Sequence, residues 1–463
     1  MELSGPVTSE VHLPDQCWSD LLRVGLASRV RNAAGGERLV LDPDLDLFLP
    51  LLARFGVRLV PMEIDRAPVK FCTGTIKFPV GTGQRDGGAA TTIPAGGQAD
   101  TSAYAALSCL GELSERLSLC SLGEQDSRVE IDLKLQSQIE LGDVLGYSVR
   151  QMTALAGQLG FGSGQAGAEG AGSGGFSSRP VNLRRLGDGA LSSYPGAGVL
   201  FGEFELITGR PGGFASTVGC AVWRDREGAR QRALLELVER DAVAQAWYNR
   251  LGITRIEDAL IEALLPPSLS AHLKEKRRFW GLYSVATDLQ VHIVLSLSCE
   301  PDGRRTAFGS AAGWDLASAS KSAVTEMLQS ENALELMERA FVGERPESEK
   351  PKRLPRHLVY AKETSVFDDF LSPAVGAGVP ADKETVYSYS DLLDSCLCAG
   401  IDIWEFDATR SDLNIPCIKL VSEHLCSWEP RFGKARLYQG VVERGLRSQP
   451  AAEQDFETRP FPF

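Results

Sequence analysis

The residues whose types and spacing best suit chemistry are two pairs of glutamates, each followed by an arginine. Residues 110–116 have the sequence LGELSER and residues 234–240 have LLELVER. On a helix, glutamates three residues apart share one face, and an arginine four residues after the first glutamate joins them. Two such helices facing each other would gather four carboxylates, an oxygen set that suits Mg²⁺ together with a nucleotide phosphate. Each arginine could then pair with a carboxylate or a phosphate.

The alternative for each motif is a solvent-exposed helix face on which glutamate and arginine form ordinary surface pairs. Residues 335–339, ELMER, repeat the spacing and are interpreted in this way, as an outward helix extension. The segments AALSCLGEL and ALLELV are apolar around the first two motifs, which predicts burial on much of those helices. Unpaired buried carboxylates are costly, so a bound cation or partner is favoured there.

Other common catalytic patterns are absent from the sequence. There is no GxxxxGK[ST] phosphate loop, no GxGxxG opening a helix and no GxSxG elbow. The ten cysteines are scattered and the five histidines have no ligand-like spacing, so a structural zinc site is not expected and the thiols are predicted to be reduced and buried.

The acidic motifs must be positioned by long helices that alternate with strands. Apolar periodicity predicts helices over residues 100–119, 227–251 and 316–340. Strand-like runs are expected at 199–207, 214–223, 282–288 and 291–300, and the Gly- and Thr-rich stretch 74–97 is predicted to form turns. This alternation indicates an α/β or α+β class, and the two similar motifs suggest internally duplicated strand–helix units.

The chain is expected to divide into an N-terminal subdomain, residues 1–70, and a larger domain, residues 71–463. The segment 162–175, GSGQAGAEGAGSGG, predicts a flexible loop, and a proline-containing tail occupies 459–463. A net charge of −13 argues against a general nucleic-acid binder. Neither a membrane helix nor a signal peptide is evident, which predicts a cytoplasmic protein.

Several segments together resemble the YcaO-domain family. "ASTVGCAVWRDREGARQRALLELVERDAVAQAWYNRL" is similar to the central family motif, and "SCLGELSER" to the first. "KSAVTEMLQS" resembles the third motif, and "RFGKARLYQ" and "DATRSDLNIPCIKLVSE" resemble later segments. The likeness runs from about residue 70 to the end, with all three motifs in order. It implies a YcaO-like fold that binds ATP and Mg²⁺.

The resemblance assigns roles to individual residues. It implies that Mg²⁺ is held by five glutamates: Glu112, Glu115, Glu236, Glu239 and Glu326. Nucleotide contacts are implied for Ser108, Glu112, Arg116, Glu236, Arg240 and Gln329. The tail residues Pro460, Pro462 and Phe463 match the proline-rich end that is thought to order the active site in azoline-forming members, and are assigned to catalysis.

The implied reaction is ATP-dependent cyclodehydration of a ribosomally made precursor peptide. Phosphorylation of a backbone amide oxygen turns it into a leaving group, and a Cys, Ser or Thr side chain closes a thiazoline or oxazoline ring. A separate leader-binding or E1-like partner is expected to deliver the peptide, with Trp247, Tyr248 and the 162–175 loop as candidates for its path. For the two aromatic residues, core packing is the favoured alternative. A flavin azoline oxidase in the same complex and a homodimer are further candidate partners.

Three positions differ from the family pattern. Gly96-Gly97-Gln98 lacks the lysine common before the first motif, Ser216-Thr217-Val218 lacks an asparagine, and the tail lacks a third proline. Two alternatives therefore stay open beside the cyclodehydratase. One is a YcaO enzyme that makes thioamides or amidines, and the other is a non-catalytic YcaO-fold scaffold of a peptide-modifying complex.

Overall fold

The computed structural model describes residues 13–31, 37–62, 67–79, 90–129, 139–159, 179–209, 213–342, 356–371 and 382–460. The predicted loop 162–175 and the tail residues Pro462 and Phe463 lie outside these ranges. The chain forms two compact units. Unit 1 comprises residues 1–125, 221–229 and 407–418, and unit 2 comprises residues 126–220, 230–406 and 419–463. The predicted division at residue 70 stays a prediction.

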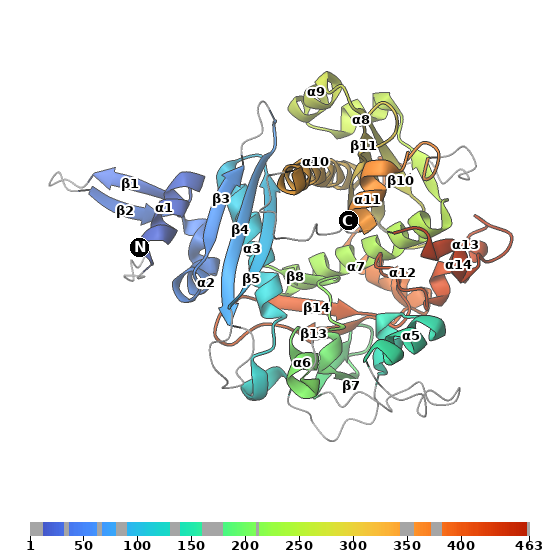
Figure 1. The fold of residues 1–463 in the computed structure, drawn as a ribbon, viewed down its shortest axis with the longest axis horizontal. Helices are drawn as coiled ribbons and strands as arrows, with labels where there is room; N and C mark the ends of the chain where they lie inside the picture. The colour runs from blue at the N-terminus through green and yellow to red at the C-terminus, as the bar shows by residue number, and fades with distance from the viewer. Residues whose placement is uncertain are drawn as a thin grey trace. The chain divides into compact units, whose positions relative to one another are not determined.

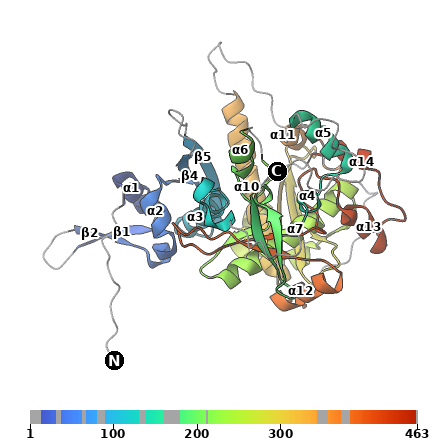
Figure 2. The ribbon, with the colours of Figure 1, turned by 90° about the horizontal axis from the view of Figure 1, so that it is seen from below.

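Unit 1 is built on the antiparallel sheet β3-β4-β5, with helix α3 packed against β4 and β5 (Figures 1 and 2). Thr101 caps α3 by accepting a hydrogen bond from the Tyr104 N–H. The elements are α1 (Asp15–Val24), β1 (Ala27–Arg31), β2 (Glu37–Leu41), η1 (Pro43–Phe48), α2 (Leu49–Arg54), β3 (Arg58–Met62), β4 (Lys70–Pro79), β5 (Ala90–Ala99), α3 (Ser102–Ser118) and η2 (Gly123–Gln125).

Unit 2 contains the four-stranded antiparallel sheet β12-β11-β10-β9, with the long helix α10 packed on β11 and β12. A second sheet begins with the order β7-β6-β13, in which β6 pairs antiparallel with both neighbours. The strands lying wholly or partly in this unit are β6 (Pro180–Arg185), β7 (Leu191–Pro195), β8 (Cys220–Val222), β9 (Ile253–Arg255), β10 (Phe279–Val285), β11 (His292–Cys299), β12 (Ala307–Gly313), β13 (Trp404–Asp407) and β14 (Cys417–Val421).

The helices of unit 2 follow the same chain order. They are η3 (Ser127–Val129), α4 (Leu141–Leu145), α5 (Val149–Leu159), η4 (Gly196–Gly198), α6 (Glu203–Thr208), α7 (Arg226–Asn249, of which 230–249 belong to this unit), α8 (Asp258–Leu264), α9 (Pro267–Glu275), α10 (Leu316–Val342), α11 (Arg356–Glu363), α12 (Tyr389–Cys398), η5 (Ala435–Leu437), α13 (Gln439–Glu443) and α14 (Glu453–Glu457). None of the helices in the described residues has the length and apolar character needed to cross a membrane.

The mixed α and β class and the three long helices were predicted correctly, but three segments were not. The run 214–223 was expected to be a strand, but only residues 220–222 form one, β8. The stretch 74–97 was expected to form turns, yet much of it belongs to strands β4 and β5, whose glycines serve packing rather than reversal. The run 199–207 was expected to be a strand, but residues 203–208 form helix α6, which lies between two glycines in the left-handed conformation, Gly202 and Gly209.

Glycine lets a helix lie directly on a strand in both units. A Cβ atom at Gly97 of β5 would lie within 3.0 Å of the backbone of α3, at Ala105 and Cys109. At the matching position of β12, a Cβ on Gly309 would meet the backbone of α10 at Ala323 and Met327 equally closely. The two strand–helix pairs therefore share one packing device, which supports the predicted internal duplication.

Substituting Gly97 with alanine is expected to lower the free energy of unfolding by about 1–3 kcal/mol, because the helix must move away from the strand. The control is Gly111→Ala, within α3 itself, where a Cβ would meet nothing within 4 Å. That change should raise stability by about 0.5–1 kcal/mol, since alanine is the better helix former. Urea unfolding of both variants measures the difference, and equal effects would contradict the close-packing account.

Candidate functional site

The first glutamate of each helix motif is held by a backbone N–H from the strand or turn that precedes the helix. The same bond occurs three times, at a sequence separation of 16 or 17 residues. The donors and acceptors are Gly96 N to Glu112 Oε2 (2.9 Å), Gly219 N to Glu236 Oε2 (3.0 Å) and Ser310 N to Glu326 Oε2 (3.1 Å). The first pair lies in unit 1 and the other two in unit 2. Each bond orients the carboxylate and favours its charged form.

The second glutamate of the first two motifs is held by the strand of the following repeat. In unit 1, Glu115 accepts the Val222 N–H at 3.0 Å. In unit 2, Glu239 accepts the Ala312 N–H at 3.2 Å and the Ser310 hydroxyl at 2.6 Å. Each of these glutamates thus connects its helix to the strand of the following repeat. The acidic residues therefore hold the fold together as well as being candidates for ligand binding.

The motif arginines pair with these carboxylates but keep one donor unused. Arg116 pairs with Glu112, and Arg240 pairs with Glu236 at 3.3 Å and Glu239 at 2.9 Å. In both arginines the Nε atom is buried and has no hydrogen-bond partner among the residues that the structure describes. The guanidinium carbon of Arg240 also lies 3.2 Å from the ring centroid of Trp428, a contact that holds the side chain flat.

Negative charge is in excess around Arg240. Burial raises the pKa of Glu239 above its ordinary value. Burial and, next, the charge of Glu239 raise the pKa of Glu326 to about 8. For Arg240, burial lowers the pKa, but the charges of Glu239 and Glu236 outweigh it, so its pKa is raised. The Arg240 guanidinium pairs with Glu236 and Glu239, and its charge also interacts with that of Glu326. A further cation would stabilise the ionised forms of these carboxylates.

The donor chemistry of these residues fits Mg²⁺ and phosphate. Carboxylate oxygens are ligands that Mg²⁺ prefers, and buried arginine donors without partners suit phosphate oxygens. Within the described ranges, no group of three or more His, Cys, Asp or Glu side chains already has the arrangement of a metal site. The residues therefore supply the right atoms, which are engaged by the motif arginines and by backbone N–H groups.

The remaining predicted residues occupy less defined positions. Ser108 is exposed on α3, one turn before Glu112, and Gln329 is partly buried on α10, one turn after Glu326. Pro460 is partly buried and follows Arg459, whose Nη1 donates to the Tyr248 carbonyl oxygen at 2.5 Å.

The two aromatic candidates for a peptide path are core residues. Trp247 is 2% exposed and packs against Phe308 and Phe370, and Tyr248 is fully buried. The alternative favoured from the sequence, core packing, is therefore correct.

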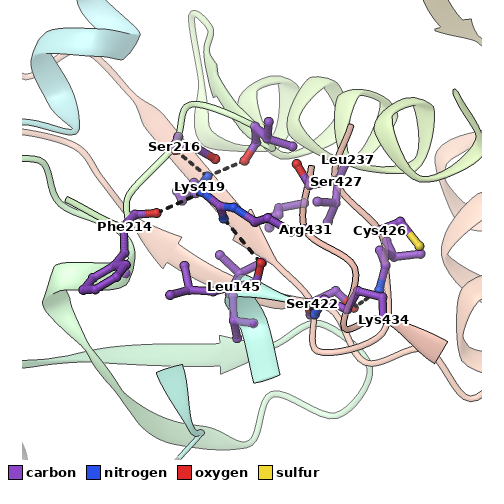
Figure 3. A pocket seen from close by; sticks show the side chains of 16 residues that line it. Leu145, Phe214, Ser216, Leu237, Lys419, Ser422, Cys426, Ser427, Arg431 and Lys434 are labelled. Atoms are coloured by element: carbon purple, nitrogen blue, oxygen red, sulfur yellow. Dashed lines mark hydrogen bonds between the residues drawn. The ribbon is translucent and has the colours of Figure 1, made fainter. Parts of the chain in front are cut away.

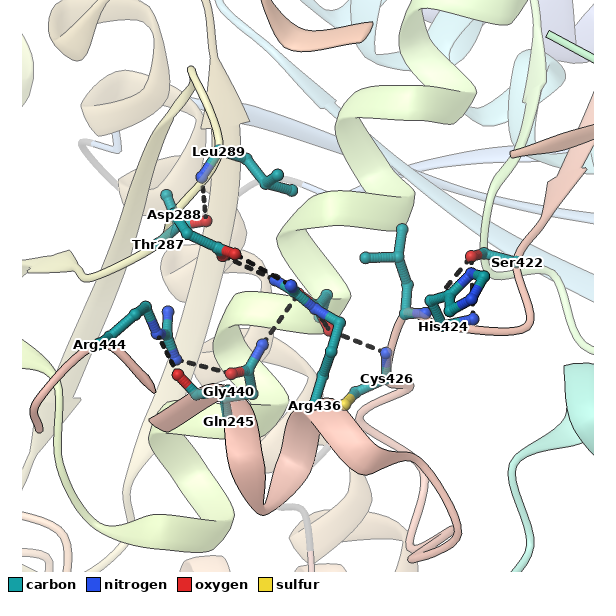
Figure 4. Close-up of polar contacts among 12 residues, drawn as sticks. Gln245, Thr287, Asp288, Leu289, Ser422, His424, Cys426, Arg436, Gly440 and Arg444 are labelled. Carbon is teal, nitrogen blue, oxygen red and sulfur yellow. Dashed lines mark hydrogen bonds and ion pairs between the residues drawn. The ribbon is translucent and has the colours of Figure 1, made fainter. Parts of the chain in front are cut away.

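Sequence reasoning missed a buried polar network directly after the second motif (Figure 4). Asp241 is fully buried and accepts hydrogen bonds from the Cys426 N–H (2.8 Å), Gln245 (2.8 Å) and Arg436 (2.9 Å). Arg436 also pairs with Asp288 at 2.7 Å. The network ties α7 to the 424–440 segment. A charged residue placed between apolar helix positions, as in ERDAVAQA, was the available signal.

Lys434 of this segment gives unit 2 a measurable pH dependence. Burial lowers the pKa of Lys434 from 10.5 to about 8. Between about pH 8 and 10.5 the unfolded chain holds this proton and the folded chain does not, so its contribution to stability rises with pH in that window and is lost as pH falls through 8. The free energy of unfolding of the wild type minus that of Lys434→Met, measured in chloride buffers, should therefore increase from pH 8 to pH 10. A flat difference would contradict the assignment.

Part of the chain matches the model of a known protein family. Residues 201–426 match the family of YcaO cyclodehydratases, described as ATP- and Mg²⁺-binding. The matched range includes the second and third motifs, while the first motif lies before it. Curated proteins gave no match to the chain.

Three solved structures have a similar fold at low identity. A heterocyclase in complex with substrate and cofactor has a TM-score of 0.67 at 22% identity, with 88% of this chain and 55% of that chain covered. YcaO from Methanopyrus kandleri, bound with AMPPCP and Mg²⁺, has a TM-score of 0.56 at 16% identity, covering 86% of this chain and 91% of that one. A chain of the E. coli microcin synthetase McbBCD complex also has a TM-score of 0.56, at 14% identity, covering 88% and 96%.

This chain spans only about half the length of the heterocyclase, so that protein's full activity is not transferred by the likeness. The family match gives ATP and Mg²⁺ as cofactors, which confirms the sequence prediction for them. The family match therefore identifies residues 201–426 as a YcaO-family domain, and the likeness in fold extends over most of the chain.

Proposed function

We propose that the chain is an ATP-dependent cyclodehydratase that forms thiazoline or oxazoline rings in a ribosomally made precursor peptide. The observation that carries the proposal is the repeated carboxylate held by a backbone N–H, together with the group of Glu236, Glu239 and Glu326 around Arg240, in which Glu239 and Arg240 are buried. Three carboxylates around one arginine suit a Mg²⁺–nucleotide ligand better than a structural ion pair.

In this proposal, Glu236, Glu239 and Glu326 hold Mg²⁺ in unit 2, and Arg240 offers its free Nε–H to a phosphate oxygen. The roles of Glu112, Glu115 and Arg116 in unit 1, and of Ser108 and Gln329, stay predictions from the motifs. Bound ATP would supply a phosphoryl group that converts the amide oxygen into a leaving group. The protein's own contribution is to orient the carboxylates through Gly219 and Ser310 and to hold Arg240 flat against Trp428.

The peptide is proposed to reach the enzyme through a separate leader-binding or E1-like protein. A chain of similar fold is part of the McbBCD complex of a microcin synthetase, which supports a role for this chain in a larger assembly. A flavin azoline oxidase is a further candidate member. Pro460, Pro462 and Phe463 are proposed to complete the active site. The cytoplasmic location predicted from the sequence stays a prediction.

The proposal is tested by incubating the purified chain with ATP, Mg²⁺, the partner protein and the precursor peptide, and recording the peptide mass. Loss of one water for each modified residue, dependent on ATP, is the expected result. A gain of sulfur in place of oxygen would move the chain to thioamide formation. An unchanged mass, with ATP still bound, would favour a non-catalytic scaffold.

A further inference from the structure

A small cavity in unit 2 is lined by two buried lysines and a partly buried arginine (Figure 3). It has a volume of about 50 Å³ and is bordered by Lys419, Arg431 and Lys434, with the hydroxyl-bearing residues Ser216 and Ser427. A cavity needs about 10–15 Å³ in this measure for each water, so the space holds a few waters or one small polar ion. The charged lining disfavours an apolar ligand.

The two lysines are held only by neutral groups. Lys419 is 3% exposed and donates to the carbonyl oxygens of Ser216 (2.8 Å) and Val218. Lys434 is 5% exposed and donates to three carbonyl oxygens, those of Asp143, Ser422 (3.0 Å) and Glu423 (2.8 Å). In the part of the chain that the structure describes, neither ammonium group forms an ion pair with a carboxylate. A buried charge without a counter-charge is costly.

Arg431 adds a third cation. Burial lowers the pKa of Lys419, and the nearby positive charge of Arg431 acts in the same direction. Glu429 pairs with Arg431 at 2.8 Å and neutralises one of the three charges. The residues that line the cavity therefore include three cations and no carboxylate. From outside the lining, Glu236 and Glu429 act on Lys419, and Asp143, Glu423 and Asp241 act on Lys434. Lys419 has used two of its three N–H donors, and the carbonyl contacts of Arg431 are long, at 3.4 and 3.5 Å. Donors remain for an anion.

We propose that this cavity binds one tetrahedral oxyanion of the phosphate class. A phosphate anion suits a lining that has three cations and no carboxylate, and its oxygens suit lysine and arginine donors. The proposal does not depend on the proposed reaction, because it concerns the binding of an anion in the absence of peptide and turnover.

The test is a calorimetric titration of the full chain with inorganic phosphate, at an ionic strength kept constant with chloride, and supported by phosphorus NMR. Saturable binding at one site is expected. Lys419→Met should weaken it by about tenfold or more, because a charge-assisted hydrogen bond is lost. Lys274→Met is the control, since Lys274 is an exposed lysine paired with the exposed Glu262. Its phosphate affinity should equal that of the wild type.

Lys419 also supports the 216–218 turn, so Arg431→Gln provides a second variant in case Lys419→Met does not fold. Absence of saturable phosphate binding by the wild type would overturn the proposal. Equal affinity in the wild type and in both cavity variants would also overturn it. If ADP displaces the phosphate, the oxyanion is a nucleotide phosphate. If phosphate binds with unchanged affinity in the presence of ADP, the site serves free phosphate. Both results support an oxyanion site and distinguish the two sources.

Discussion

Replacing Glu326 with glutamine is expected to abolish ATP-dependent modification of the peptide while leaving the folded protein at least as stable. Glutamine keeps an oxygen that can accept the Ser310 N–H, so the local fold should survive. It removes one of three clustered carboxylates, and with it a proposed Mg²⁺ ligand. Activity should fall by more than about 100-fold, as expected when a group that stabilises transition-state charge is lost.

The expected gain in stability follows from the burial of Glu326 and its repulsion by the neighbouring carboxylate of Glu239. Burial and the neighbouring Glu239 raise the pKa of Glu326 to about 8, so its ionised form is disfavoured in the folded chain without a cation. An uncharged side chain avoids that cost, and the free energy of unfolding near pH 7 should rise by about 1–3 kcal/mol.

The control is Glu335→Gln, an exposed position further along the same helix, which should change neither activity nor stability. Turnover of the precursor peptide and urea unfolding measure the two halves separately. Full activity of Glu326→Gln would contradict the metal assignment. Lower stability together with lost activity would instead indicate a structural role.

Asp241→Ala is expected to cause the largest loss of stability, about 3–5 kcal/mol, because it removes the acceptor of the buried Cys426 N–H and leaves Arg436 paired with the partly exposed Asp288. Asp241 is fully buried and receives hydrogen bonds from Arg436, Gln245 and the backbone of Cys426 (Figure 4). Chemical denaturation monitored by fluorescence and circular dichroism gives the free energy of unfolding.

Asp258→Asn is the matched control, since Asp258 also pairs with an arginine, Arg255, but both side chains are at least half exposed. Its effect should stay below about 1 kcal/mol. A second comparison is the double variant Asp241→Asn with Arg436→Met. If the pair acts as one unit, the double variant should be less damaged than the sum of the single changes. Strict additivity would contradict coupling between the two residues.

The features of the candidate site that depend on residue spacing along a helix could be predicted from the sequence. The i and i+3 glutamates with an arginine one residue further predicted a shared helix face. Their apolar neighbours correctly indicated burial for Glu239, whereas Glu236 is partly exposed. Apolar periodicity likewise located α3, α7 and α10. These features are local, so a single sequence contains the information for them.

Features that depend on distant segments were not predictable in the same way. The N–H groups of Gly96, Gly219 and Ser310 that hold the first glutamates come from backbone and leave no side-chain signature. The stretch 74–97 was taken for turns because it is rich in glycine, whereas Gly97 serves the contact between β5 and α3. Lys419 lies in the otherwise apolar run IPCIKLV and is buried. The sequence shows that this lysine is unusual, but its partners become evident only from the three-dimensional structure.

The most direct test of the central claim follows the amide oxygen itself. A precursor peptide carrying heavy oxygen at the carbonyl before the modified Cys, Ser or Thr is incubated with the chain, its partner, ATP and Mg²⁺. If the enzyme phosphorylates the amide, the heavy oxygen should leave in inorganic phosphate, one atom for each ring formed. Heavy oxygen released only as water, with ATP consumed and rings formed, would contradict amide phosphorylation and require a different role for the nucleotide.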